Sequence, residues 1–228
     1  MEFIIMKLFF FKTPASMRSV ILLETLQVDY KLIFINLRER DQYLPAFLKL
    51  NPLHTAPVLL DTKNNITITE SGAMGMHLTT NYNKDAKLLG GTMQQKALVL
   101  QWYFWAISNL ESNLLNLYNL ATALEDRQVV VLQRLEDTLN ILNNELANKK
   151  FIANEFSIAD IFIYPGLSTI IRVLGENKKI TKEFKNVNTY LANLEAMPSF
   201  ATAKAKIDAV DVTKKLTNDE LEKIIASA

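Results

Sequence analysis

Short apolar runs and helical repeats alternate over the first third of the chain. Four apolar runs have the length of strands, and they cover residues 6–11, 30–36, 57–61 and 66–69. Apolar positions at helical spacing lie between and after them, over residues 16–27, 40–50 and 71–82. The order βαβαββα predicts a small α/β domain in which helices cover a sheet.

A polar stretch separates this region from the remainder of the chain. Residues 83–91 include the pair Gly90-Gly91, which is typical of a linker between domains. Beyond it the strand patterns disappear and long helical repeats begin. The sequence therefore predicts an α/β domain over residues 1–82 and a larger all-helical domain over residues 92–228.

Two helix starts in the second half carry recognisable caps. In the segment FSIAD, Ser157 is expected at the N-cap, and Asp160 three positions later can reach back to the cap amide. Thr217 and Glu220 form the same pattern before the last helix. These residue pairs are expected to stabilise helices and to take no part in chemistry.

Composition narrows the chemistry that the chain can perform. Its 25 basic and 24 acidic side chains nearly balance, which gives no argument for a nucleic-acid partner or an anionic membrane surface. Among 228 residues there is no cysteine, so the protein has no thiol nucleophile or thiolate ligand of its own. With His54 and His77 as the two histidines, no metal site is expected. Sulfur chemistry would need a thiol brought by a ligand.

The apolar N-terminal stretch MEFIIMKLFFFK is interpreted as a buried strand. Glu2 precedes its apolar part, Lys7 interrupts it, and no small-residue cleavage site comes after it, unlike a secretory signal. No continuous apolar run reaches the roughly 18 residues of a membrane span. The expected location is the cytoplasm, with no membrane partner.

Three motifs in this order resemble the cytosolic glutathione transferases. They are NPLHTAPVLLD at residues 51–61, TES at residues 69–71 and FSIAD at residues 156–160. NPxHTxPVL looks most like the delta and theta types, whereas TPxxxR, beginning at Thr13, looks more like the zeta and nu types. The resemblance implies a thioredoxin-like glutathione-binding domain followed by an all-helical domain, usually in a two-fold homodimer.

The resemblance also implies where glutathione binds. The Ala56-Pro57 bond is cis in the family, so that the backbone of Ala56 pairs with the extended peptide of the ligand. Glu70 and Ser71 lie where a strand ends and a helix begins, which suits an ammonium and a carboxylate on one carbon. His54 matches a histidine that delta-type members use near the glycine carboxylate. Without the family, Ser71 reads as a helix cap and His54 as a surface residue.

The side chain that activates the thiol differs between the types of this family. The first strand reads KLFFF, with Phe where the alpha, mu and pi types have Tyr, and the cysteine of the omega and beta types is missing. The resemblance leaves the hydroxyls of Thr13 and Ser16. Thr13 has the zeta and nu-type spacing to Arg18, and Ser16 is expected inside the first helical turn. Ala15 stands where nu-type members carry Asn.

Aromatic residues near the start of the long helical region are candidates for a substrate pocket. Trp102, Tyr103 and Trp105 are expected to line a pocket for a small hydrophobic electrophile, although such a stripe is more often core or dimer interface.

Three functions remain open from the sequence. The first is a glutathione transferase that conjugates small hydrophobic electrophiles or reduces peroxides. The second is a non-catalytic binding or assembly module of the same fold. The third is a zeta-like glutathione-dependent isomerase, although TPASM replaces the SSCxW motif expected there.

Overall fold

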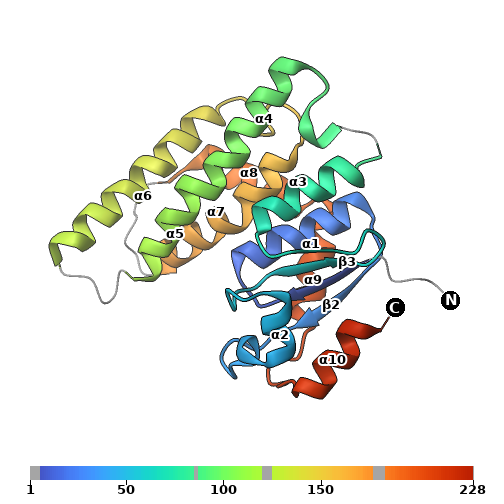
Figure 1. Ribbon diagram of the computed structural model, residues 1–228. Helices are drawn as coiled ribbons and strands as arrows, with labels where there is room; N and C mark the ends of the chain where they lie inside the picture. The colour runs from blue at the N-terminus through green and yellow to red at the C-terminus, as the bar shows by residue number, and fades with distance from the viewer. Residues whose placement is uncertain (1–5, 85–86, 120–124, 177–182, 228) are drawn as a thin grey trace. The chain divides into compact units, whose positions relative to one another are not determined.

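The chain forms two compact units in a computed structural model that describes residues 6–84, 87–119, 125–176 and 183–227 (Figure 1). The first unit combines residues 1–84 with residues 199–228, and the second spans residues 85–198. Residues 1–5 of the apolar N-terminal stretch and residues 85–86 of the predicted linker lie outside the described residues.

A four-stranded sheet forms the centre of the first unit. Its strands are β1 (Met6–Phe10), β2 (Tyr30–Phe34), β3 (Val58–Asp61) and β4 (Ile66–Ile68). They lie in the order β2-β1-β3-β4, with β1 parallel to β2 and antiparallel to β3, and β3 antiparallel to β4. The predicted α/β order is confirmed.

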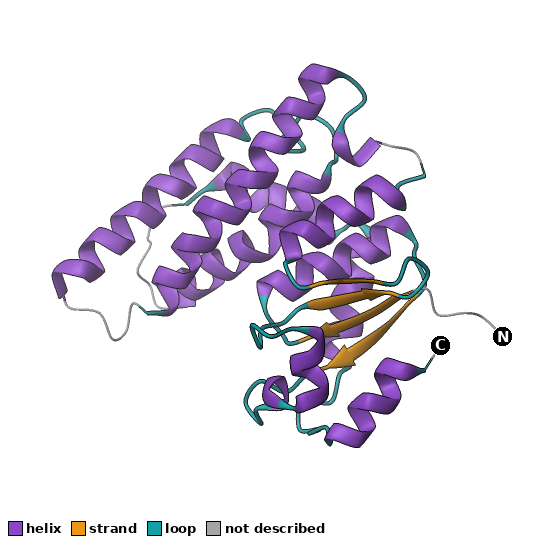
Figure 2. Ribbon diagram, in the orientation of Figure 1, coloured by secondary structure: helices purple, strands orange, loops and turns teal. Residues whose placement is uncertain are grey.

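Helices cover both faces of this sheet, as Figure 2 shows in purple around the orange strands. The helices α1 (Pro14–Leu26) and α3 (Ser71–Asn81) lie on one face, and α2 (Pro45–Leu50) and α10 (Asn218–Ala226) lie on the other. Successive residues of β1 point to opposite faces. Phe9 accordingly joins a core cluster with α2 and α10.

Prolines fix two helix starts that the apolar pattern placed differently. The helix α1 begins at Pro14, two residues earlier than the pattern indicated, with Thr13 as its N-cap. The predicted helix over residues 40–50 is a short 3₁₀ helix, η1 (Asp41–Tyr43), followed by α2 from Pro45. Proline suits the first helical position because its fixed φ is already helical and its missing N–H is not needed there.

The C-terminal residues 199–228, which the sequence assigned to the helical domain, belong to the first unit in the structure. Leu216 and Leu221 are buried in the same cluster as Phe9, so burial of apolar surface holds this segment against the sheet. The segment includes α9 (Pro198–Asp208) apart from its first residue, and all of α10. The predicted capping box between Thr217 and Glu220 is present at the start of α10.

Lys7 ties the end of α10 to the central strand. Its side chain is fully buried, and its ammonium group donates hydrogen bonds to the carbonyls of Ile225, at 3.0 Å, and of Ser227. Burial, and secondarily the nearby charge of Lys31, lowers the pKa of Lys7. A cation at the C-terminal end of a helix satisfies carbonyls that have no partner within the helix.

A buried carboxylate fastens the hairpin of β3 and β4 to the end of α3. Asp61 has no exposed surface, and it accepts hydrogen bonds from Tyr82 Oη at 2.6 Å and from Asn64 Nδ2 at 2.8 Å. His77 Nε2 lies 2.8 Å from the same carboxylate. Burial alone would raise the pKa of Asp61, but the hydrogen bonds outweigh it and hold this pKa below the usual range. Burial, together with the hydrogen bond to Asp61 and the negative charge of that carboxylate, raises the pKa of Tyr82 to about 12.

The second unit is built of helices, which confirms the predicted all-α class. Its elements are η2 (Lys87–Leu89), α4 (Met93–Trp105), the π-helical turn η3 (Ala106–Leu110), α5 (Glu111–Tyr118), α6 (Glu125–Glu145), α7 (Ile158–Glu176) and α8 (Lys185–Glu195). At the start of α7, the buried Asp160 accepts hydrogen bonds from the amides of Ile152 and Ser157, both at 2.9 Å, and from Tyr190 Oη at 3.0 Å. Asp160 therefore has the folding role that the sequence indicated.

Within the described part of the chain, α7 is the one helix long and apolar enough, by length and composition, to cross a membrane. No such segment was expected from the sequence, because the expectation required continuous apolar residues. In the structure 67% of this apolar stretch is buried inside the protein, as in a core helix.

Leu221→Ala should destabilise the first unit. Removing a fully buried leucine from a core leaves a cavity and costs about 3 kcal/mol of unfolding free energy. Hydrogen exchange of the backbone amides should show weaker protection in β1 and β2, with α7 unchanged. The exposed Lys223→Ala on the same helix is the control. If the backbone amides of both units lost protection from exchange equally, the assignment of α10 to the first unit would be contradicted.

Asp61→Asn should make the protein less stable at neutral pH and less sensitive to acid. Because the pKa of Asp61 is lower in the folded than in the unfolded protein, its contribution is present above the unfolded pKa of about 3.9 and is lost as the pH falls through the folded value. We expect the variant to lose roughly 2 to 3 kcal/mol of unfolding free energy at pH 7. The difference from the parent should shrink below about pH 4. Urea unfolding across this pH range, with the exposed Asp29→Asn as control, measures it.

Candidate functional site

Strand pairing brings three segments to one end of the sheet. Phe9 pairs with Val58, so the chain leaves β1 toward Thr13 at the end where it enters β3 from Pro57. Leu59 pairs with Ile68, so the chain also leaves β4 toward α3 at this end. The structure therefore places the segments that hold Thr13, the loop before β3 and the start of α3 around the end of β1.

Thr13 and Ser16 form a hydroxyl pair in the first turn of α1. Thr13 Oγ1 accepts a hydrogen bond from the amide of Ser16 at 3.3 Å and donates one to Ser16 Oγ at 3.2 Å. Thr13 is half-buried, whereas Ser16 has no exposed surface. Thr13 is thus the helix cap and the more exposed of the two hydroxyl residues, whereas the sequence pattern indicated Ser16 for the helix start.

Asn51 organises the loop before β3. Its fully buried amide Nδ2 donates to the carbonyl of Thr55 at 2.8 Å, and its Oδ1 accepts from the amide of Leu53 at 3.0 Å. The Ala56-Pro57 bond at the end of this loop is cis, as the resemblance implied. No role for Asn51 was expected from the sequence, although an Asn before Pro at the start of this motif is a turn-forming signal.

The backbone of Ala56 offers hydrogen-bonding groups at this loop. Ala56 is half-buried, and within the described residues neither its N–H nor its C=O has a hydrogen bond to the protein. Such a free edge next to a strand can pair with an extended peptide.

His54 lies in the same loop with an exposed side chain and a φ of 48°. Its ring contacts the ring of Tyr43 with 5.0 Å between centroids. The guanidinium of Arg40 lies 5.0 Å from the centroid of Tyr43. The sequence pattern does not show this group of aromatic and basic side chains, because α2 separates residues 40–43 from His54 along the chain.

Glu70 and Ser71 begin α3, with Glu70 as the N-cap. Glu70 is exposed and makes no side-chain cap bond, and in the described chain its carboxylate and the half-buried hydroxyl of Ser71 have no hydrogen-bond partner. The carboxylate of Glu70 can pair with an ammonium, while the free amides at the N-terminus of α3 can bind a carboxylate on the same carbon.

The three aromatic residues of α4 differ in their surroundings. Tyr103 is fully buried and packs on Phe162 of α7, with 4.5 Å between ring centroids, so it is a core residue of the helical unit. Trp102 is buried, and its ring meets the half-buried Trp105 edge to face at 5.3 Å. The pocket role of Trp102 and Trp105 stays a prediction.

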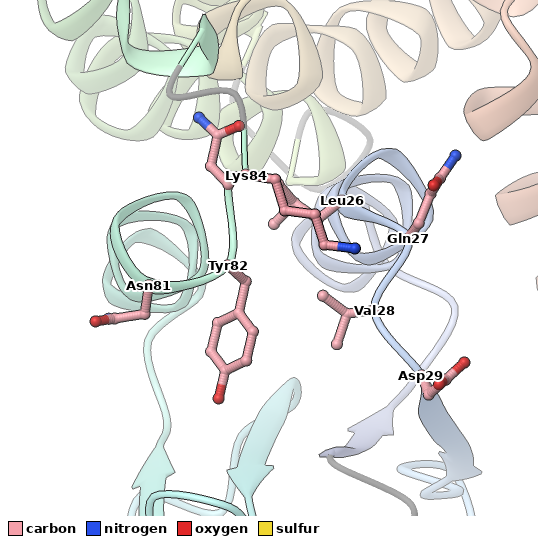
Figure 3. Close-up of a pocket in the computed structure, with 8 residues that line it drawn as sticks. Leu26, Gln27, Val28, Asp29, Asn81, Tyr82 and Lys84 are labelled. Atoms are coloured by element: carbon pink, nitrogen blue, oxygen red, sulfur yellow. The ribbon is translucent and has the colours of Figure 1, made fainter. Parts of the chain in front are cut away.

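A separate cavity of about 330 Å³ lies at the opposite end of the first unit, where α1 and α3 end (Figure 3). It is lined by Leu26, Gln27, Val28, Asp29, Asn81, Tyr82, Asn83 and Lys84. Both helices run away from the Thr13 end, so this cavity is no part of the candidate site. Across the described residues, no group of three His, Cys, Asp or Glu side chains could hold a metal ion.

Comparison with known proteins agrees with this arrangement. The sequence matches the family described as "Glutathione S-transferase, N-terminal domain" over residues 5–80, and "Glutathione S-transferase, C-terminal domain" over residues 97–198. Glutathione S-transferase D6 of Drosophila melanogaster is 29% identical over 93% of this chain and 96% of its own. The disulfide-bond oxidoreductase YfcG of Escherichia coli is also 29% identical, over 72% of this chain and 80% of its own.

A solved structure shares the fold at lower identity. The glutathione transferase URE2P6 of Phanerochaete chrysosporium, in complex with oxidized glutathione, superimposes with a TM-score of 0.82 and 22% identity, over 91% of this chain and 98% of that one. The two matched domains, in the order and with the folds described above, show that this chain belongs to the glutathione transferase family.

Proposed function

We propose that the protein is a glutathione transferase in which the hydroxyl of Thr13 holds the bound thiol as a thiolate. The observation that carries this proposal is the contrast between the two hydroxyls. Thr13 is half-buried at the N-terminus of α1, whereas Ser16 is fully buried behind it. Thr13 therefore contacts the sulfur, and Ser16 is a positioning residue.

The hydrogen bonds of the pair allow this division of roles. In the structure Thr13 Oγ1 donates to Ser16 Oγ at 3.2 Å. When a thiolate binds, the Thr13 hydroxyl turns away from Ser16 and donates to the negatively charged sulfur. Ser16 can then donate its own proton to Thr13 Oγ1, and the amide of Ser16 keeps Thr13 in place. A neutral hydrogen bond of ordinary strength is exchanged for a charge-assisted one.

The interactions at Thr13 can supply the free energy needed to lower the thiol pKa, so no general base is required. Lowering a thiol pKa from about 8.5 by two units requires about 2.7 kcal/mol. One hydrogen bond to a charged acceptor contributes roughly 1.5 to 3 kcal/mol. The N-terminus of α1 adds up to about 1 kcal/mol. The thiolate then attacks a small hydrophobic electrophile or a peroxide.

The remaining site residues bind the peptide part of glutathione in this proposal. The γ-glutamyl carboxylate lies at the start of α3 near Ser71, and its ammonium pairs with Glu70. The cysteinyl backbone pairs with Ala56 beside Pro57, in the manner of an added strand. The glycine carboxylate lies near His54.

A second candidate function is glutathione-dependent reduction of disulfides. It is favoured by the 29% identity with a disulfide-bond oxidoreductase and by the oxidized glutathione bound to a protein of the same fold. This chain has no cysteine, so both electrons would come from two glutathione molecules. The thiolate at Thr13 attacks the disulfide and releases one thiol. A second glutathione then resolves the mixed disulfide to give glutathione disulfide.

We further propose a cytoplasmic homodimer, in keeping with the two-fold symmetry of most soluble oligomers. Analytical ultracentrifugation should give twice the chain mass of 25.9 kDa. If the protein sediments as a monomer at all concentrations used in the activity assays, the homodimer proposal is contradicted.

Glutathione affinity followed by turnover distinguishes these functions. We expect retention on immobilised glutathione, elution by free glutathione and conjugation of 1-chloro-2,4-dinitrobenzene. Reduction of hydroxyethyl disulfide with glutathione, faster than conjugation, would favour the second candidate. Retention with neither activity would indicate a binding module, and absence of retention would refute the glutathione assignment.

Thr13→Val should raise the pKa of the bound thiol by about one to two units, because it removes the donor but keeps the side-chain shape. The ultraviolet absorbance of the enzyme-bound thiolate, titrated against pH, measures this. Thr13→Ser should retain the low pKa. Thr13→Val also removes a helix cap, which costs about 1 kcal/mol, so urea unfolding should accompany the titration.

Ser16→Ala is the matched test of the positioning role. It should shift the thiol pKa by less than Thr13→Val, because the buried Ser16 acts only through Thr13. Identical titrations of Thr13→Val and the parent would show that Thr13 is not the donor.

A further inference from the structure

A cavity of about 290 Å³ lies within the first unit at the ends of β1 and β2. It is lined by Phe11, Lys12, Phe34, Asn36, Arg38 and Val212. The proposed glutathione contacts, Ala56, Glu70 and Ser71, use none of these residues. The cavity is therefore open to a second ligand.

The strand order places this cavity beside the proposed thiol. Phe11 and Lys12 directly precede Thr13 in the chain. β3, entered through the cis-proline loop, pairs with one edge of β1, and β2 pairs with the other. Thr13 thus lies between the loop proposed to hold glutathione and the cavity, so an occupant of the cavity approaches the sulfur from the side away from the peptide.

Aromatic rings form one wall of the cavity. The rings of Phe11 and Phe34 are stacked, with 5.6 Å between centroids and 27° between planes. Phe10 supports Phe34 from behind, edge to face at 5.7 Å. Each ring of a stacked pair covers one face of the other, so the outer face of the pair is the flat apolar surface left for a planar ligand.

Two cations border the same space. The side chains of Lys12 and Arg38 are exposed, and among the described residues neither has an ion pair. No acidic residue lines the cavity. Of the nearby acids, Glu39 lies 3.8 Å from Lys215, and the buried Asp41 accepts a hydrogen bond from the amide of Asn36 at 2.9 Å. Both cations are therefore available to an anion.

The polar side chain at the base of the cavity is already satisfied. Asn36 Nδ2 donates to the carbonyls of Val212 at 3.0 Å and Lys214 at 3.1 Å, and its Oδ1 accepts from the amide of Arg38 at 3.2 Å. Asn36 thus anchors the C-terminal segment as a wall and leaves ligand recognition to the rings and the cations.

We propose that this cavity selects planar aromatic electrophiles that carry a carboxylate, with the ring packed against the stacked pair of Phe11 and Phe34 and the carboxylate on Lys12 and Arg38. The inference rests on the proposed transferase function and names its substrate class. For a chlorinated nitrobenzoate, the thiolate sulfur forms a bond to the ring carbon that bears chlorine. The carbon–chlorine bond then breaks and chloride leaves with the electron pair, while the thiol proton has already passed to solvent when the thiolate formed.

The test compares 4-chloro-3,5-dinitrobenzoate with its methyl ester, which has the same ring and leaving group but no charge. We expect the parent to have a higher kcat/KM for the acid than for the ester. Lys12→Gln and Arg38→Gln should each lower this acid-to-ester ratio about tenfold, as expected for the loss of about 1.4 kcal/mol. Added salt should lower the ratio as well. The exposed Lys63→Gln, with the same change in net charge, should leave the ratio unchanged.

A binding measurement separates this inference from the proposed function. Calorimetry with unreactive 3,5-dinitrobenzoate and its methyl ester should show tighter binding of the acid, weakened about tenfold by Lys12→Gln or Arg38→Gln. If the acid binds in this way but neither chlorinated compound is conjugated, the transferase proposal fails and the binding site stands. If both are conjugated with an acid-to-ester ratio that Lys12→Gln and Arg38→Gln leave unchanged, the inference is overturned and the transferase proposal stands.

Discussion

The pairing of β1 with a strand on each side is the interaction on which the first unit depends. β1 is buried along its whole length, and its alternating side chains fill the core on both faces of the sheet. Phe9 packs with α2 and α10 on one face, and Lys7 on the same face binds the carbonyls at the end of α10. Because β1 lies between β2 and β3, the segment after β1 stands between the loops of both neighbours.

That segment carries a hydroxyl at the start of a helix. The chain has no cysteine, so in the proposed reaction the protein supplies no sulfur and only holds and polarises the thiol of its ligand. Thr13 can do this while it also caps α1, because one oxygen accepts the amide of Ser16 and keeps its own proton to donate. The burial of Ser16 is what assigns the contacting role to Thr13 and the supporting role to Ser16 in this proposal.

Local signals identified most of the fold. Strand and helix order came from the spacing of apolar residues, and the cap at Thr217 from the four residues that form it. The helices α1 and α2 begin at Pro14 and Pro45 and not where the apolar pattern starts, because proline favours the first helical position whether or not it belongs to that pattern. The attachment of the last 30 residues was not predictable, because Leu216 and Leu221 bury against residues far away in the chain.

Motifs whose residues are close together in the chain were enough to indicate the family from the sequence, and the resemblance reduced the candidates for a thiol donor to Thr13 and Ser16. The difference in exposure between the half-buried Thr13 and the buried Ser16 comes from the tertiary structure, because it depends on how α1 packs. The cavity beside Thr13 is likewise a tertiary feature. Phe11, Phe34 and Val212 come together only when parallel strands pair and the C-terminal segment returns to the sheet.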